Sequence, residues 1–156
     1  MAGRITARLI ELGIILPTPA TPVANYVPYV LSADLLVVSG QIPMDGAEVR
    51  HTGKLGRDVD LRDGIAAARL CFVNLLAQVR AACGGDLDRV AQVIRLGGFI
   101  ASTPEFHDHA AVMNGASDLA VDVFGDAGRH ARSTIGVPAL PRDAAVEVEG
   151  MFRLIA

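Results

Sequence analysis

Residues 61–83, LRDGIAAARLCFVNLLAQVRAAC, decide the fold of this 156-residue chain. They predict a helix that is buried along one face, because apolar side chains recur every three or four positions. These side chains are Ile65, Ala68, Phe72, Leu75, Leu76, Val79 and Cys83. Asp60 is the expected N-cap, and Gly84-Gly85 is the expected end of the helix.

Strands are expected on both sides of this helix. The apolar and β-branched runs that predict them, each bounded by turn residues, are 26–31, 34–41, 90–100, 132–137 and 145–154. A second helix, with Ser102 or Thr103 as its N-cap, is expected to run to Gly125. The order β-β-α-β-α-β-β predicts an α+β domain, with two helices packed on one face of a mixed sheet. Residues 25–156 form this domain, whereas residues 1–24 add a short helix and a proline-rich arm.

Composition excludes several classes of protein. The chain is 51% hydrophobic, which is too apolar for a disordered protein, and its net charge of −3 does not favour nucleic acid or a membrane as a partner. Polar residues interrupt every apolar run before the roughly 18 residues of a membrane span, and residues 1–16 lack a signal-peptide core. Cys71 and Cys83 lie about 18 Å apart along one helix, too far for a disulfide, so two free thiols in the cytoplasm are expected.

The open face of the predicted sheet needs a cover. Two helices cover one face only, yet residues 35–38 and 93–94 are apolar on both sides of the pleat. An uncovered apolar face is an association site. We therefore expect a homo-oligomer whose subunits cover one another's open faces.

Four polar residues on the last two strands are the best candidates for chemistry: Arg132, Thr134, Glu147 and Glu149. If Ile135 and the valines of these strands face the helices, all four point to the open face. In a hairpin centred on Leu140, Arg132 would lie opposite Glu147. Such a pair is either a cross-strand ion pair that ties neighbouring subunits, or an arginine fork that binds a carboxylate beside a glutamate that activates water.

The other polar residues give weaker signals. His107 and His109 are two positions apart on the expected helix, so they cannot form a metal pair on one face. His130 is either a histidine at the rim of a pocket or a solvated loop residue. The two cysteines have no CxxC partner, so no metal site is expected.

Two segments carry a family resemblance. They are VVSGQIP at 37–43, and ARST at 131–134 leading through Leu140-Pro141 to VEVE at 146–149. From about residue 25 to residue 152, the chain resembles the reactive-intermediate deaminase superfamily, also called the YjgF or L-PSP endoribonuclease family. The resemblance implies a chorismate-mutase-like fold, and a homotrimer with a ligand pocket in each cleft between subunits. It also implies hydrolysis of reactive enamines and 2-imino acids to 2-keto acids and ammonia, with no metal or organic cofactor.

The resemblance implies roles for single residues. Arg132 corresponds to the arginine that binds the substrate carboxylate, and Glu147 to the glutamate that orients the attacking water. The positions that correspond to the lining of the pocket are Tyr26, Gly40 and Asn114. Thr134 is expected to supply a backbone or hydroxyl contact, and it stands where the family often has cysteine.

The chain also departs from the family pattern, as a divergent subgroup would. Gly136 stands where an acidic residue is common, and NYVPY at 25–29 replaces the usual Gly-Pro-Tyr start. Two alternatives therefore stay open. One is a protein that holds a carboxylate metabolite in the same cleft without turnover. The other is RNA cleavage, which rests on the family's second name and is disfavoured by the 4% aromatic content and the missing basic stripe.

Overall fold

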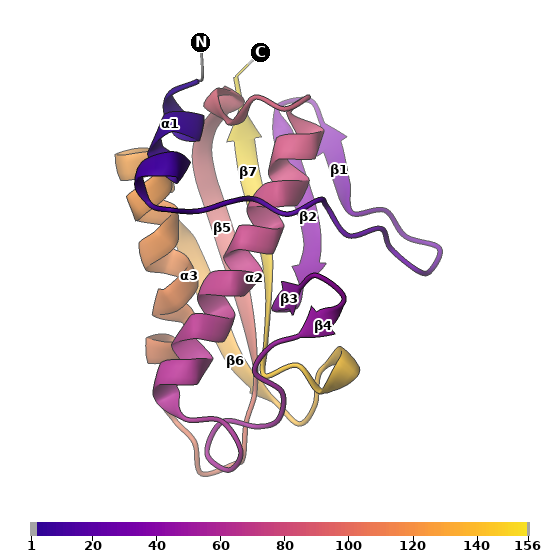
Figure 1. Ribbon diagram of the computed structural model, residues 1–156, viewed down its shortest axis with the longest axis vertical. Coiled ribbons are helices and arrows are strands. Elements are labelled where there is room, and N and C mark those ends of the chain that lie inside the picture. The colour runs from indigo at the N-terminus through magenta and orange to yellow at the C-terminus, as the bar shows by residue number, and fades with distance from the viewer. Residues whose placement is uncertain (1–2, 156) are drawn as a thin grey trace.

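In the computed structural model, which describes residues 3–155, two long helices cover one face of a five-stranded mixed sheet (Figure 1). The strand order is β1-β2-β7-β5-β6, and only β5 and β6 pair in parallel. The strands are β1 (Tyr29–Ser32), β2 (Leu35–Gln41), β5 (Val90–Ala101), β6 (Ala131–Val137) and β7 (Val146–Leu154). A separate two-stranded ribbon joins β3 (Met44–Asp45) to β4 (Glu48–Val49). The predicted α+β class and mixed sheet are confirmed.

The helix α2 (Leu61–Ala82) begins and ends as predicted. The Asp60 carboxylate accepts a hydrogen bond of 2.8 Å from the backbone N–H of Asp63, which satisfies one of the free donors of the first turn. After the helix, Gly84 and Gly85 adopt positive φ angles of 67° and 97°, which favour glycine. By length and composition α2 could cross a membrane, but the core helix of a soluble protein passes the same test.

The core lies between the sheet and the two long helices. Phe152 on β7 pairs with Leu36 on β2 and with Val93 on β5, and all three are fully buried against the helices. Each such side chain stabilises the fold by roughly 1.5–3 kcal/mol. The buried side chains of the central strands β2, β5 and β7 therefore determine which face of the sheet packs against the helices.

The second helix, α3 (His109–Phe124), begins later than predicted, so the expectation that Ser102 or Thr103 caps it is wrong. Both residues continue the extended chain instead. The Ser102 N–H donates to Val137 O at 3.1 Å, and the Thr103 N–H donates to Leu55 O at 3.0 Å. These long-range bonds hold the backbone at 102–103 out of a helix, and Pro104 disfavours a helical residue before it.

The strand order corrects a second expectation, because β6 and β7 do not form a hairpin. β5 lies between them and pairs with both, in parallel with β6 and antiparallel with β7. The first strand also starts at Tyr29 and not at Tyr26. Pro28 has no N–H for a sheet ladder, and its carbonyl accepts from Ser39 N at 2.9 Å.

The N-terminal segment is packed onto this core. In α1 (Arg4–Glu11), Ile5 and Leu9 are buried, and the Asp88 carboxylate accepts hydrogen bonds from the N–H groups of Arg4 and Ile5 at 2.7 and 2.8 Å. The arm then crosses α2, where Gln78 Nε2 donates to Ala20 O at 2.8 Å (Figure 1). Three short 3-10 turns complete the chain: Leu87–Arg89, Gly125–Gly128 and Pro141–Asp143.

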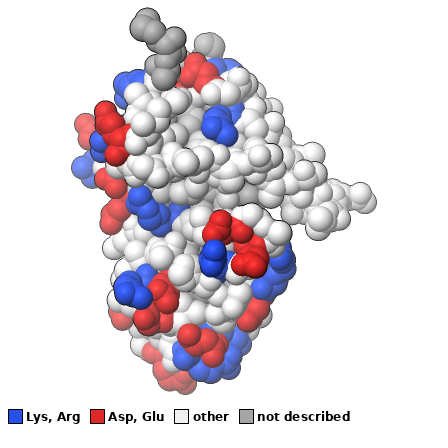
Figure 2. Space-filling model, viewed as in Figure 1, with Lys and Arg blue, Asp and Glu red and all other residues white. Residues whose placement is uncertain are grey.

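On the face that carries the helices, acidic and basic side chains are interspersed along the left edge and the lower half, with no basic stripe (Figure 2). On the opposite, open face of the sheet, apolar side chains remain accessible. Ile135 is 53% exposed, Val30 54% and Leu35 37%. Within one copy, nothing among residues 3–155 covers them.

Candidate active site: two separate halves

Arg132 points to the helix side of the sheet, and the expectation that it shares the open face with Glu147 is wrong. In the parallel register of β5 and β6, Thr134 lies beside Gly98. A Cβ on Gly98 would overlap the Met113 side chain of α3, so this side of the two strands faces the helix. Arg132, two positions earlier, therefore also faces α3, and Ile135 takes the open side. As an edge strand, β6 does not need Ile135 in the core.

Three neutral groups of α3 hold the Arg132 guanidinium. Nη1 donates to Asn114 Oδ1 at 2.8 Å and to Ser117 Oγ at 3.1 Å, and Nη2 donates to Ala110 O at 3.3 Å. A guanidinium has five N–H donors, so Nε–H and one N–H of Nη2 remain. These two nitrogens are neighbours in the planar group, and together they form a fork that suits a carboxylate.

No acid neutralises this guanidinium within residues 3–155. The ion pairs of the described chain join other residues, so Arg132 and Glu147 form no ion pair within one chain. A positive charge held by neutral acceptors attracts an anion from solution.

A hydrogen-bonded chain extends from Arg132 to His130. His130 Nδ1 lies 2.6 Å from Gly128 O, which can only accept, so Nδ1 carries a proton. In the neutral ring, Nε2 then accepts from the Ser117 hydroxyl at 2.9 Å, and the same hydroxyl oxygen accepts from Arg132. His130 is thus held in place and is not a solvated loop residue. Sequence reasoning missed Ser117, although its position three residues after Asn114 places both on one helix face.

Thr134 completes this group, which we call the arginine half: Arg132, Asn114 and Thr134. Its side chain shares the helix-facing side of β6 with Arg132. Its Oγ1 is buried and has no hydrogen-bond partner in the described structure. A buried hydroxyl without a partner is costly, and a ligand beside Arg132 could satisfy it.

Glu147 lies on the open face of β7, as expected, together with Glu149. Its carboxylate rests on Gly40 of β2, so closely that a Cβ at position 40 would overlap Glu147 Oε1. Burial raises the pKa of Glu147, and the negative charge of Glu149 raises it further. Glu149 is itself 3.5 Å from Arg95 Nη1.

Tyr26 and Gly40 line a cavity of about 280 Å³ between the arm and β2. We call Tyr26, Gly40 and Glu147 the glutamate half. Arg142 also lines this cavity, and its positive φ of 56° places it in the left-handed region. Its Nη2 donates to Ala47 O at 3.0 Å. Sequence reasoning missed both Arg142 and Gln78, which lines the same cavity from α2.

The two halves do not meet within one chain. β5 separates β7 from β6, which places their strands about 10 Å apart at the usual strand spacing. In addition, Arg132 faces the helices and Glu147 faces the open side. The six predicted site residues therefore form two separate groups of three, with Arg132 and Glu147 on opposite faces of the sheet.

Neither half has the side chains of a metal site. Within residues 3–155, no cluster of three or more His, Cys, Asp or Glu side chains could hold a metal ion. Cys71 is fully buried, and burial raises the pKa of its thiol well above the ordinary value. The donors available to a ligand are therefore a guanidinium, amides, hydroxyls and a carboxyl group.

Comparison with known proteins gives consistent matches. A family model described as "YjgF/chorismate mutase-like, putative endoribonuclease" matches residues 6–152, including the part of the arm that lies outside the motifs. Protein TCP17 of Trypanosoma cruzi is 47% identical over 154 residues, covering 98% of this chain and 96% of that protein.

Two solved structures are also similar. Atu1372 from Agrobacterium tumefaciens, described as of unknown function, is 48% identical with a TM-score of 0.91, over 97% of this chain and 92% of its own. A "putative endoribonuclease" from Shewanella oneidensis is 35% identical with a TM-score of 0.94, over 97% of this chain and 100% of its own.

Proposed function

Because the chain belongs to the YjgF/chorismate-mutase-like family, we propose that it hydrolyses reactive enamine and 2-imino acid intermediates to 2-keto acids and ammonia. The family's fold accounts for the mixed sheet and the two helices. The proposed activity is that of a hydrolase acting on a C–N bond. It would take place in the cytoplasm, where Cys71 and Cys83 stay reduced.

The observation that carries the proposal is the hydrogen bonding of the Arg132 guanidinium. Its guanidinium is oriented by three neutral acceptors, has no acid beside it in the described chain, and keeps two adjacent donors. A 2-imino acid has a carboxylate next to its reactive carbon. Binding that carboxylate in the fork would hold the imine carbon at a fixed distance from Arg132.

Glu147 supplies the second function in this proposal. A carboxyl group with a raised pKa is a stronger base than an ordinary carboxylate, so it can orient a water and take its proton. The water oxygen bonds to the imine carbon, and the π electrons of the C=N bond move to nitrogen, which takes up a proton. The carbinolamine then loses its hydroxyl proton as the C–N bond breaks, leaving a 2-keto acid and ammonia.

This mechanism needs both halves in one place, so we propose that the site forms between copies of the chain in a homotrimer. The arginine half of one copy would face the glutamate half of the next. The exposed apolar side chains of the open face and the unpaired edge of β6 support such an assembly, because both are surfaces that association would cover.

Two other functions have less support. Binding of a carboxylate metabolite without turnover would use the same Arg132 fork, and it would not need Tyr26, which lies outside β1 and is half-exposed. RNA cleavage is the activity that the family description prints. The interspersed charges of the helix-bearing face and the net charge of −3 do not favour an RNA partner (Figure 2).

The test is direct. Freshly generated 2-iminopropionate is supplied to the protein, and its disappearance is followed together with the release of ammonia and pyruvate. We expect the wild type to accelerate the reaction and Arg132→Ala to lose most of that acceleration. A wild type no faster than Arg132→Ala would contradict the proposed activity, and pyruvate binding without turnover would favour the binding protein.

A further inference from the structure

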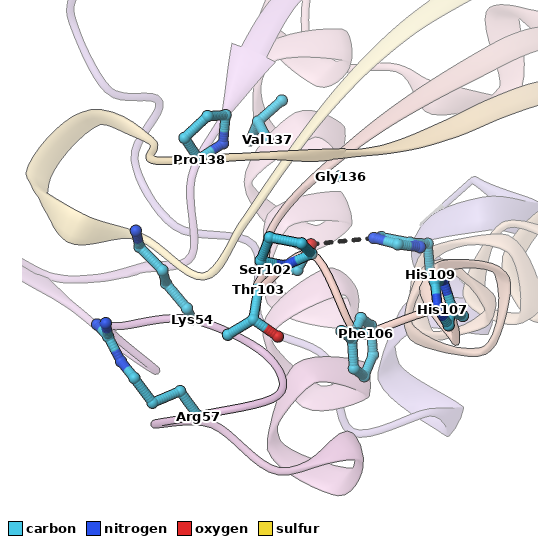
Figure 3. A pocket seen from close by; sticks show the side chains of 11 residues that line it. Lys54, Arg57, Ser102, Thr103, Phe106, His107, His109, Gly136, Val137 and Pro138 are labelled. Atoms are coloured by element: carbon cyan, nitrogen blue, oxygen red, sulfur yellow. Dashed lines mark hydrogen bonds between the residues drawn. The ribbon is translucent and has the colours of Figure 1, made fainter.

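A cavity of about 630 Å³ lies at the C-terminal ends of β5 and β6 and shares no residue with either half of the proposed active site (Figure 3). Its walls come from three segments: the loop at 54–57, residues 102–109 up to the first residue of α3, and residues 136–138 at the end of β6. This volume lies within the range of about 300–1,000 Å³ that is typical of small-molecule sites.

Backbone hydrogen bonds hold the first wall in place. The Leu55 N–H donates to Ala101 O at 2.9 Å, and Leu55 O accepts from the Thr103 N–H at 3.0 Å. The Lys54 N–H donates to Asp58 Oδ2 at 3.0 Å, and three further N–H groups donate to Lys54 O. The wall is therefore preorganised, which lowers the entropic cost of binding a ligand there.

The lining of the cavity is basic, with no aspartate or glutamate. Arg57 donates from Nε and Nη2 to Asp58, at 3.0 and 2.9 Å, which leaves its Nη1 unused. The Lys54 ammonium makes no ion pair within residues 3–155. In Figure 3, both side chains lie at the same end of the cavity, so one ammonium without an ion pair and one free guanidinium nitrogen lie there.

The opposite wall carries a neutral polar pair. Ser102 Oγ lies 3.0 Å from His109 Nε2, and the His109 ring packs edge-on to Phe106 with centroids 5.2 Å apart. Gly136 makes room for this pair. A Cβ at position 136 would lie 2.5 Å from His109 Nε2 and 2.8 Å from Ser102 Oγ, so a larger residue would displace them.

We propose that this cavity binds a small organic anion. Its acidic group, a carboxylate or a phosphate, lies against the Lys54 ammonium and Nη1 of Arg57. A polar group at its other end meets Ser102 and His109. Its apolar body contacts the remaining walls, which are formed by Phe106, Val137 and Pro138. Charge-assisted hydrogen bonds supply the attraction, and the apolar walls exclude an ion as strongly hydrated as free phosphate.

The test uses benzoate, phenyl phosphate and inorganic phosphate as probes, with the His109 ring resonances as the readout. We expect benzoate or phenyl phosphate to shift these resonances saturably, and inorganic phosphate to bind more weakly. The tighter of the two aromatic probes identifies the acidic group. Lys54→Ala should weaken the binding about tenfold, because it removes a charged donor. Gly136→Ala should abolish the shift, with far-UV circular dichroism as the check on folding.

Two controls separate this site from other sources of binding. Arg62→Ala removes an exposed arginine of α2 that does not line the cavity, and it should leave binding unchanged. Arg132→Ala should also leave it unchanged, whether or not the chain is a deaminase. The proposal fails if no aromatic probe shifts the His109 resonances, if Lys54→Ala binds as tightly as the wild type, or if Arg132→Ala removes the binding.

Discussion

Replacing Arg132 by lysine and by alanine separates the positive charge of this residue from its fork. The guanidinium donates three hydrogen bonds, to Asn114, Ser117 and Ala110, and two further N–H donors remain free for a carboxylate. A lysine ammonium has three donors on one nitrogen, so it cannot satisfy those acceptors and form a two-point contact as well. The two variants should therefore differ in activity.

The magnitude follows from the two free donors. A hydrogen bond to a charged group is worth about 1.5–3 kcal/mol, and the two bonds of a fork are not fully additive. Arg132→Ala should cost about 3 kcal/mol, or roughly 150-fold in kcat/KM for 2-iminopropionate. Arg132→Lys keeps the charge and should cost about 1.5 kcal/mol, or roughly tenfold.

The assay measures kcat/KM with 2-iminopropionate, and Kd for pyruvate by calorimetry. Arg129→Ala is the matched control, because Arg129 is an exposed arginine close to Arg132 that pairs with Asp126 at 3.4 Å. It should leave both constants unchanged. If Arg132→Lys matched the wild type, charge alone would suffice and the fork would play no part. If Arg132→Ala matched it, the carboxylate would bind elsewhere.

Three further predictions test the surroundings of Arg132 and Glu147. Ser117→Ala removes one acceptor of Arg132 and the partner of His130, so kcat/KM should fall about fivefold, whereas Ser133→Ala, on the other face of β6, should leave it unchanged; equal values for both variants would show that Ser117 does not position the arginine. Gly40→Ala places a Cβ against the Glu147 carboxylate, so turnover should fall while pyruvate binding at Arg132 persists, and unchanged turnover would contradict a role for Glu147 at its observed position. Burial raises the pKa of Glu147 in the folded state. The favourable contribution of Glu147 to the free energy of unfolding is therefore complete below the ordinary glutamate pKa of 4.5, and it is lost as the pH rises through the raised pKa. Glu147→Gln should therefore increase the free energy of unfolding at neutral pH, measured by denaturant titration, with no gain in acid; a gain confined to acid would refute the sign.

Local signals in the sequence predict α2 well and α3 less well. Asp60, the apolar stripe and Gly84-Gly85 act within a few residues of the helix that they define. The start of α3 depends on bonds from Ser102 and Thr103 to Val137 and Leu55, which are distant in sequence. A capping motif cannot reveal that its backbone donors are already used in the sheet.

In the candidate site, too, features set by nearby residues are predicted correctly, and features set by contacts distant in sequence are not. Strand alternation predicts correctly that Glu147 faces the open side, because β7 lies inside the sheet and its valines must be buried. For β6 the assumption fails, because an edge strand leaves Ile135 exposed while Arg132 faces α3. β5 lies between β6 and β7 in the sheet, and the residue pattern of a strand does not predict which strands will be its neighbours. The roles of single residues depend on the family resemblance.

Mixing two inactive variants is the most direct test of the claim that each site combines halves from two copies. Arg132→Ala and Glu147→Gln chains are denatured together in equal amounts, refolded, and assayed with 2-iminopropionate. In a trimer with random mixing, about one quarter of the clefts would pair an intact arginine half with an intact glutamate half, so about a quarter of the wild-type activity should return. A mixture as inactive as either variant alone would contradict the account.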